Sequence, residues 1–253
     1  MLRVLSLIAL ASTLLATPAA GADLKVTSAG AVRGLIAQII DDYARQTGQK
    51  FEFTVGTTGQ LRAIIGSGFP ADLVITSAPL MGELEKTGNV TPGSRADLGR
   101  VGIGIVVRDG ASVPDVSTAD GFKTAMIDAP RIAIVDPTGG AVYQPHLNGV
   151  YQSLGITDVV AKKAVMQVGG KEVAEAVVAG QADLGVAFIS EIIPIKGAKL
   201  AGPLPPALQG YVVYAAAIPK ASTDPAAARA FIDALISPAM ARRWTAAGFE
   251  APK

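Results

Sequence analysis

Four turns of the chain carry glycines and hydroxyl groups where a predicted strand passes into a helix. Such turns let backbone N–H groups approach a ligand, and the unpaired N–H groups and dipole of a helix start favour an anion. Each turn alone is typical of an ordinary N-cap, but four together predict an anion-binding cleft. The turns are 28–31 (Ser-Ala-Gly-Ala), 56–59 (Gly-Thr-Thr-Gly), 136–140 (Asp-Pro-Thr-Gly-Gly) and 169–171 (Gly-Gly-Lys).

Few residues of the chain could support other chemistry. The sequence has no cysteine and one histidine, His146, which excludes disulfides, thiolate metal sites, thiol nucleophiles and paired-histidine sites. Its 22 basic residues nearly balance its 21 acidic residues, so nucleic acid is not an expected partner. We therefore expect a binding protein with no cofactor, no metal and no catalytic residues, not an enzyme.

Short apolar strands alternate with helices along the chain, and this pattern predicts an α/β fold with mixed, parallel-rich sheets flanked by helices. Helices are predicted to begin near residues 32, 58, 79, 140 and 171, and one last helix is predicted over 225–247. The predicted strands are 24–27, 51–55, 71–76, 101–107, 131–135, 164–168 and 184–188.

The first 22 residues are typical of a secretory signal peptide. Arg3 precedes the apolar run 4–15, and the small residues 20–22 offer a cleavage site. We therefore expect a periplasmic protein that begins near Asp23.

Two long apolar segments, 101–107 and 211–218, bracket the middle of the chain and are interpreted as crossings between two lobes. The predicted boundaries are 23–103 plus 213–253 for lobe I and 104–212 for lobe II. A hinge of two strands would leave a cleft between the lobes.

Five segments of the chain follow one another in a characteristic order: "LKVTSAGAVRGL", "FTVGTTGQLRAIIGSGFPADLVITSAPLMGEL", "RIAIVDPTGGAVY", "VAEAVVAGQADLGVAFISE" and "AARAFIDALISPAMARRWTAAGFEAPK". In this order they resemble the molybdate-binding group of the periplasmic solute-binding proteins of ABC transporters. The resemblance implies the two-lobed type II binding-protein fold. It also implies a monomer that captures a small anion such as molybdate or tungstate and delivers it to a membrane permease.

The resemblance also implies which residues bind the anion, through hydroxyl and backbone N–H groups from both lobes. Thr57 and Thr58 match the hydroxyl pair of the family, and Thr138 with Gly139 matches a donor from the opposite lobe. In the first turn, Ser28, Ala29, Gly30 and Ala31 face the same ligand. Two positions lack the usual hydroxyl group: Ala31 replaces a serine, and Phe188 replaces a tyrosine that touches the ligand.

Other donors could compensate for these two hydroxyl groups. Arg33 lies near the start of the first helix and suits a planar carboxylate, which a guanidinium group can bind with two parallel hydrogen bonds. Further candidate donors are Lys171, Ser28, Tyr143 and Gln144. The sequence leaves two ligand classes open: molybdate or tungstate, and a small organic carboxylate or another oxyanion. It also leaves open whether the protein serves transport or presents its ligand to a sensor.

Overall fold

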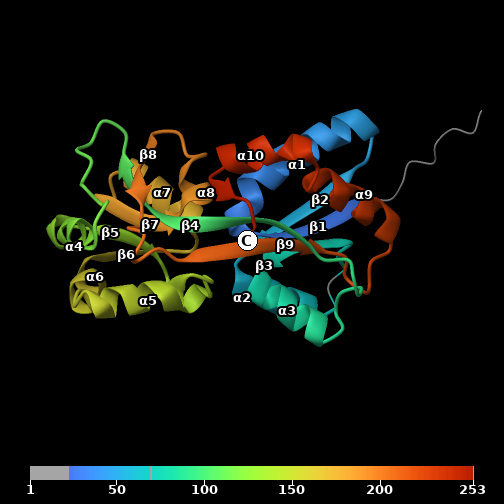
Figure 1. Cartoon of the computed structure of the whole chain (residues 1–253), viewed down its shortest axis with the longest axis horizontal. Helices are drawn as coiled ribbons and strands as arrows, with labels where there is room; N and C mark the ends of the chain where they lie inside the picture. The colour runs from blue at the N-terminus through green and yellow to red at the C-terminus, as the bar shows by residue number, and fades with distance from the viewer. Residues whose placement is uncertain (1–22, 69, 253) are drawn as a thin grey trace, which may run out of the picture.

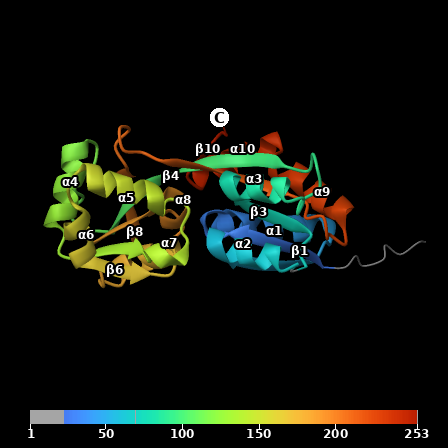
Figure 2. The same ribbon diagram turned by 90° about the horizontal axis from the view of Figure 1, so that it is seen from below.

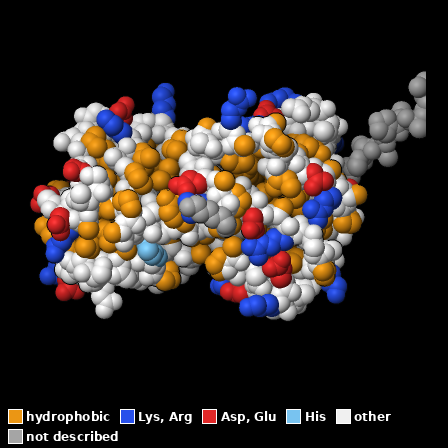
Figure 3. All heavy atoms as spheres, viewed as in Figure 1, with side chains coloured by type: hydrophobic (Ala, Val, Ile, Leu, Met, Phe, Trp, Pro, Cys, Tyr) orange, Lys and Arg blue, Asp and Glu red, His pale blue; other side chains and the backbone are white. Residues whose placement is uncertain are grey.

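The computed structural model describes residues 23–68 and 70–252, and the predicted signal peptide lies outside these residues. Two lobes stand side by side, and the chain crosses between them (Figure 1). No helix in these two ranges is long and apolar enough to cross a membrane. On the face shown in Figure 3, the outline narrows between the lobes, and basic and acidic side chains are interspersed.

Lobe I is built on a mixed sheet at the side of the N-terminus. Its strand β1 is parallel to β2 and β3, whereas β9 runs antiparallel to β3 and to the first half of β4. The short β10 pairs with the other edge of β4. These strands are β1 (Leu24–Ala29), β2 (Phe51–Gly56), β3 (Leu73–Ser77), β4 (Ala96–Arg108), β9 (Tyr211–Ala217) and β10 (Phe249–Glu250).

Helices cover the sheet of lobe I because each has one apolar face. The first helix buries Leu35, Ile36, Ile39 and Ile40 and ends at Gly48, whose φ of 76° favours glycine. The helices of lobe I are η1 (Gly30–Val32), α1 (Arg33–Thr47), α2 (Thr58–Gly66), α3 (Ala78–Lys86), α9 (Pro225–Leu235), η3 (Pro238–Met240) and α10 (Ala241–Ala246).

Lobe II has a second mixed sheet, in which β5 is parallel to β6 and β7 and the end of β4 is antiparallel to β7 and β8. Its strands are β5 (Ile132–Val135), β6 (Ala164–Gln167), β7 (Leu184–Phe188) and β8 (Ala198–Pro203). Its helices are α4 (Ala119–Asp128), η2 (Pro137–Gly139), α5 (Gln144–Ser153), α6 (Thr157–Lys163), α7 (Gly170–Val178) and α8 (Ile189–Ile192).

Strand β4 belongs to both sheets and connects the lobes (Figure 2). Its residues 96–102 pair with β9, and its residues 103–108 pair with β7 and β8. The return crossing leads from β8 into β9, so two strands form the hinge, as the sequence predicts. The predicted lobe boundaries, 103/104 and 212/213, stay predictions.

The structure corrects two predicted elements. The last helix is not continuous over 225–247, because Ser237 is extended (φ −63°, ψ 149°) before Pro238, which cannot continue a helix. The fifth helix begins at Gln144 and not near Gly140, because residues 137–139 form a 3₁₀ turn that ends at Gly140, with φ 74°.

Candidate functional site

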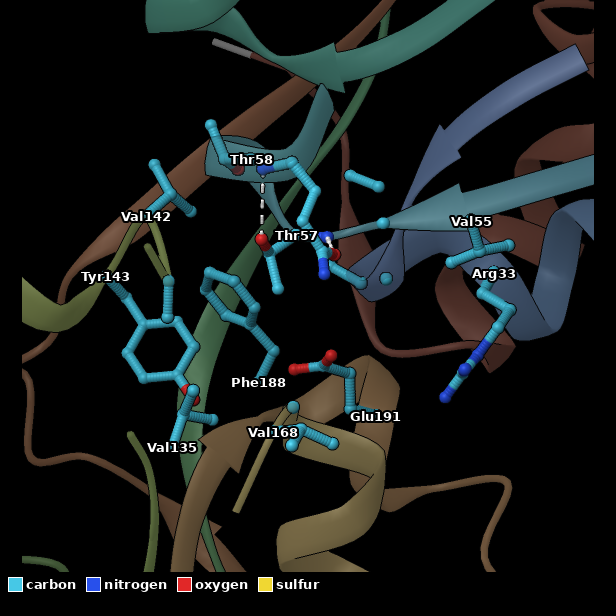
Figure 4. A pocket seen from close by; sticks show the side chains of 18 of the residues that line it. Arg33, Val55, Thr57, Thr58, Val135, Val142, Tyr143, Val168, Phe188 and Glu191 are labelled. Carbon is cyan, nitrogen blue, oxygen red and sulfur yellow. Dashed lines mark hydrogen bonds between the residues drawn. The ribbon is translucent and has the colours of Figure 1, made fainter. Parts of the chain in front are cut away.

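A cleft of about 200 Å³ lies between the lobes, where the predicted turns come together. Figure 4 shows Thr57 and Thr58 on one side of it and Phe188 and Glu191 on the other, with Arg33 at its edge. The walls are formed by residues from both lobes: Ala29, Gly30, Ala31, Arg33, Val55, Gly56, Thr57, Thr58, Gln60, Val135, Ala141, Val142, Tyr143, Val168, Gly169, Gly170, Glu172, Phe188, Glu191 and Tyr214.

The cleft collects the starts of helices from both lobes. Helices α1 and α2 begin at the carboxyl ends of β1 and β2, and α7 begins at the end of β6. Helix α5 also begins at the cleft, with Ala141 to Tyr143 in the wall. The dipoles of these helix starts favour an anion here, although the capping box of α2 and the Glu191 carboxyl group at α7 already use some of their N–H groups.

Thr57 has a structural role that leaves it able to bind a ligand. Its Oγ1 accepts a hydrogen bond from the backbone N–H of Gln60 (3.2 Å), and Gln60 Oε1 accepts one from the Thr57 N–H (2.8 Å). This capping box fixes the start of α2. Because Thr57 Oγ1 acts as an acceptor here, its hydroxyl hydrogen stays available for an anion.

The two lobes touch at a pair of glycines beside the cleft. A Cβ atom at Gly140 would lie 3.3 Å from the Cα atom of Gly59, so a side chain there would push the lobes apart. Gly140 also has a left-handed backbone, with φ 74°, which favours glycine. The glycines therefore allow the start of α2 to approach lobe II closely.

Arg33 reaches across the cleft toward lobe II. Its Nη2 lies 3.8 Å from Glu172 Oε1, and both side chains are about one-third exposed (35% and 31%). An exposed pair at this distance contributes little to stability. The guanidinium group is therefore free to exchange this weak contact for a ligand carboxylate, with which it can form two parallel hydrogen bonds.

Glu191 is an ionisable group in the wall of lobe II. Burial raises the pKa of its carboxyl group to about 7, and the negative charge of Glu172 adds to this rise. Hydrogen bonds from the backbone N–H groups of Phe188 and Gly170, together with the positive charge of Arg33, act in the opposite direction. At neutral pH the carboxyl group is therefore populated in both its neutral and its ionised form.

Aromatic side chains form the floor beside Glu191. The rings of Tyr143 and Phe188 meet edge to face with centroids 4.5 Å apart, and Tyr214 packs on the other side of Phe188 at 6.2 Å. The Tyr143 hydroxyl is buried and has no hydrogen-bond partner among the described residues. Burial and the charge of Glu191 hold the pKa of Tyr143 well above its usual range. Tyr143 thus offers a neutral donor close to the position where Phe188 lacks one.

Eight of the predicted site residues line the cleft: Ala29, Gly30, Ala31, Arg33, Thr57, Thr58, Tyr143 and Phe188.

The other four predicted site residues do not line the cleft. Ser28 is fully buried and donates to the carbonyl of Ala29 (3.1 Å). The N–H and hydroxyl groups of Thr138 both bind Asp136 Oδ1 (2.8 and 2.7 Å), and the Gly139 N–H binds the Asp136 carbonyl (2.9 Å). Lys171 Nζ binds the carboxylate of Glu175 on the same helix. Their donors are therefore used within their own lobe.

Sequence reasoning missed three residues that line the cleft: Glu172, Glu191 and Tyr214. Glu191 lies three residues after Phe188, in the first turn of α8, where an acidic residue is typical of ordinary helix capping. Tyr214 lies within a strand that the sequence predicted as a crossing. Only the approach of α7 and η1 to α8 reveals the special position of Glu191.

These features define a two-lobed α/β protein with a cleft between its lobes. The family model of bacterial extracellular solute-binding proteins matches residues 24–250, and the chain belongs to this family. The solved periplasmic molybdate-binding protein of Azotobacter vinelandii has the same fold, with a TM-score of 0.77 and 24% sequence identity. That match covers 91% of this chain and 100% of the other, so the predicted fold and family resemblance are confirmed.

Two relatives carry different functional names. A protein of Pseudomonas sp. named aconitate isomerase is 31% identical over 233 residues, which cover 90% of this chain and 87% of that protein. The molybdate-binding protein ModA of Azotobacter vinelandii is 28% identical over 243 residues, which cover 91% of both. The relatives therefore include both a binding protein and an enzyme.

Proposed function

We propose that the protein is an exported receptor that closes its two lobes around a small organic polycarboxylate. The observation that carries this proposal is the division of the cleft into an anion-favouring part and an apolar part. Arg33 and the starts of α1, α2 and α7 suit carboxylate groups. The apolar part suits a carbon skeleton and is formed by Val55, Val135, Ala141, Val142, Val168 and Phe188.

The same division argues against molybdate as the preferred ligand. A dehydrated tetrahedral dianion needs donors around all its oxygen atoms, because each missing bond to a charged ligand costs about 1.5–3 kcal/mol. Ala31 and Phe188 offer no hydroxyl group, and the Glu191 carboxyl lies in the wall. A flexible polycarboxylate can turn its charged groups toward Arg33 and place its carbon atoms on the valines. The relative named aconitate isomerase supports this ligand class.

Membership of the solute-binding family supports export of the protein and a role in transport as parts of the proposal. Residues 1–22 act as the export signal, the protein works as a monomer in the periplasm, and a membrane permease of an ABC transporter receives the ligand. Contacts from both lobes would favour the closed state, since a ligand shifts such an equilibrium by its differential affinity.

Calorimetric titration of the protein with citrate, cis-aconitate, trans-aconitate, molybdate and tungstate tests the proposal. We expect the polycarboxylates to bind and the two oxyanions to bind more weakly. Arg33→Ala should weaken polycarboxylate binding by about ten- to a hundredfold, or 1.5–3 kcal/mol. Lys171→Ala is the matched control, because Lys171 is a basic residue near the cleft that binds Glu175. Tight tungstate binding that survives Arg33→Ala would overturn the proposal.

Isomerisation of the bound acid is a second candidate function, in which the cleft is also an active site. It is favoured by the ionisable Glu191 in the cleft and by the 31% identity to a protein named aconitate isomerase. Nuclear magnetic resonance of cis-aconitate incubated with the protein would detect the formation of trans-aconitate. Binding of cis-aconitate without formation of trans-aconitate would rule out the isomerisation and would support the receptor function.

A further inference from the structure

Glu191 occupies a space between the lobes that two glycines leave open. A Cβ atom at Gly170 would lie 2.0 Å from Glu191 Oε2, and a Cβ atom at Gly30 would lie 3.3 Å from Glu191 Oε1. Gly170 starts α7 in lobe II, whereas Gly30 belongs to η1 in lobe I. Elements of both lobes therefore hold the carboxyl group in the wall of the cleft.

The carboxyl group has the properties of a general acid and base. Its pKa of about 7 lies near neutral pH, where a proton carrier is most efficient because both of its forms are populated. In Figure 4 its oxygen atoms point into the cleft and not into the protein interior. Arg95 and Arg131 pair with carboxylates elsewhere, but within residues 23–68 and 70–252 no basic side chain forms an ion pair with Glu191.

The groups around Glu191 can stabilise the charge that a proton transfer creates. Removal of a proton from a carbon atom next to a carboxyl group leaves negative charge that spreads onto that carboxyl group. Arg33 and the helix starts of the cleft present positive charge and N–H donors to such a group before the reaction begins. The unpartnered Tyr143 hydroxyl adds a neutral donor.

We propose that Glu191 is a catalytic residue that removes and returns a proton at a carbon atom next to a carboxyl group of the bound polycarboxylate. This inference rests on the proposed function, because it requires a polycarboxylate in the cleft. It assigns to this wall of the cleft a chemical step beyond ligand capture.

The step balances without a cofactor or a further reactant. The C–H bond breaks, the proton moves to a Glu191 oxygen, and the electron pair enters the conjugated system formed with the carboxyl groups and the neighbouring C=C bond. Return of the proton to the same carbon exchanges hydrogen with Glu191. Return to the far end of the C=C bond shifts the double bond and produces the other isomer. The net charge of ligand and protein is the same before and after.

Nuclear magnetic resonance in D₂O tests this step with cis-aconitate and trans-aconitate as the probes. The native protein should incorporate deuterium next to the carboxyl groups and interconvert the isomers. Glu191→Gln keeps the shape of the side chain but removes the base, so both rates should fall by about a hundred- to ten-thousandfold. Glu175→Gln is the matched control on an exposed residue outside the cleft and should react as the native protein does.

Two further measurements separate a catalytic role from a structural one. Calorimetry should show that Glu191→Gln still binds both isomers, because the neutral amide replaces a carboxyl group without adding charge. The exchange rate of the native protein should rise with pH through about 7, as the carboxyl group loses its proton. Gly170→Ala should also slow exchange, because the new methyl group displaces the Glu191 oxygen atoms.

The outcomes distinguish this inference from the proposed function. Binding of aconitate by the native protein without deuterium incorporation would overturn the catalytic role and leave the receptor function intact. Exchange at the native rate in Glu191→Gln would assign the proton transfer to another group and would also overturn it. If no polycarboxylate binds the native protein, the proposed function fails first, and the catalytic role fails with it.

Discussion

Two carboxyl groups lie in different surroundings: Asp72 in lobe I is buried, whereas Glu191 in lobe II is half-buried in the wall of the cleft. Asp72 is 2% exposed and accepts hydrogen bonds from the backbone N–H groups of Lys25, Thr223 and Asp224, at 3.0, 2.7 and 3.2 Å. The hydroxyl groups of Ser222 and Thr223 add two more, each at 3.0 Å. Glu191 has two backbone donors and otherwise faces the cleft.

The pKa values of the two carboxyl groups shift in opposite directions because the groups accept different numbers of hydrogen bonds. Burial alone would raise the pKa of Asp72, but the hydrogen bonds from Lys25, Thr223, Asp224 and Ser222 outweigh burial and lower it. For Glu191 burial outweighs the donors and raises the pKa to about 7. A carboxyl group whose acceptor positions are filled connects parts of the fold, here β1, β3 and the loop before α9. One whose acceptors are unfilled stays available for a ligand or a proton.

Asp72→Ala is the largest expected change in stability. It leaves three buried N–H groups without an acceptor, at about 1–3 kcal/mol each before relaxation, so the free energy of unfolding should fall by about 3–5 kcal/mol. Urea denaturation measures this loss. The control is Asp233→Ala on the exposed face of α9, which should change stability by less than about 0.5 kcal/mol. Equal effects of the two substitutions would show that Asp72 is not a connecting residue.

Glu191→Gln should act in the opposite direction and stabilise the protein at alkaline pH. The folded pKa of about 7 exceeds the ordinary value of 4.5, so the folded state binds the proton more tightly than the unfolded state. The stabilising contribution is complete below about pH 4.5 and is lost as the pH rises through 7. The neutral amide avoids this loss, so the variant should gain up to about 3 kcal/mol at pH 8.

Thermal unfolding of the native protein and of Glu191→Gln between pH 5 and pH 8 measures this gain. The difference between the two midpoints should widen as the pH rises. A difference that is constant across this range would show that Glu191 has an ordinary pKa. The comparison with Asp72 would then rest on geometry alone.

Ligand affinity should depend on the protonation of Glu191. An ionised carboxyl group in the cleft repels an anion, so citrate should bind up to about tenfold more tightly at pH 6 than at pH 8. Citrate is suitable because it has no C=C bond to shift. Glu191→Gln should remove this part of the pH dependence, and comparison with the variant cancels the titration of citrate itself. If calorimetry shows that citrate affinity depends on pH in the same way for the native protein and for Glu191→Gln, the ligand does not bind near Glu191.

The sequence predicted the fold better than the site, for a physical reason. Strand and helix patterns are local, and Gly48 marks the end of α1 as predicted. The helix break at Pro238 was missed, although Pro238 itself signals it. Strand β8, over 198–203, was not predicted either, since its Ala, Lys, Gly and Pro residues are poor strand formers and its pairing with β4 includes a register shift.

Several predicted site residues that line the cleft were identified from local turn chemistry. Thr57 and Thr58 follow a strand and start a helix, and this position alone brings them to the cleft. Thr138 has the same local signal, but Asp136 takes both of its donors. Glu191 has no local signal beyond capping, because its position depends on Gly30 and Gly170, which are 161 and 21 residues away in the chain. Long-range contacts decide which donors remain free.

Gly170→Ala should give the smallest change in stability. The backbone of Gly170 does not require glycine, because its φ is not positive, and alanine is the better helix former. The three atoms nearest to the new methyl group all belong to the end of the Glu191 side chain, which can rotate away, so the free energy of unfolding should change by less than about 1 kcal/mol. In Gly170→Ala the displaced Glu191 carboxyl group should become more hydrated, and its pKa should fall toward the ordinary value. Thermal unfolding should then lose the dependence on pH between 5 and 8 that the native Glu191 confers. If Gly170→Ala instead destabilises the protein by as much as Asp72→Ala, Glu191 is a connecting residue like Asp72, and the distinction between the two carboxyl groups is wrong.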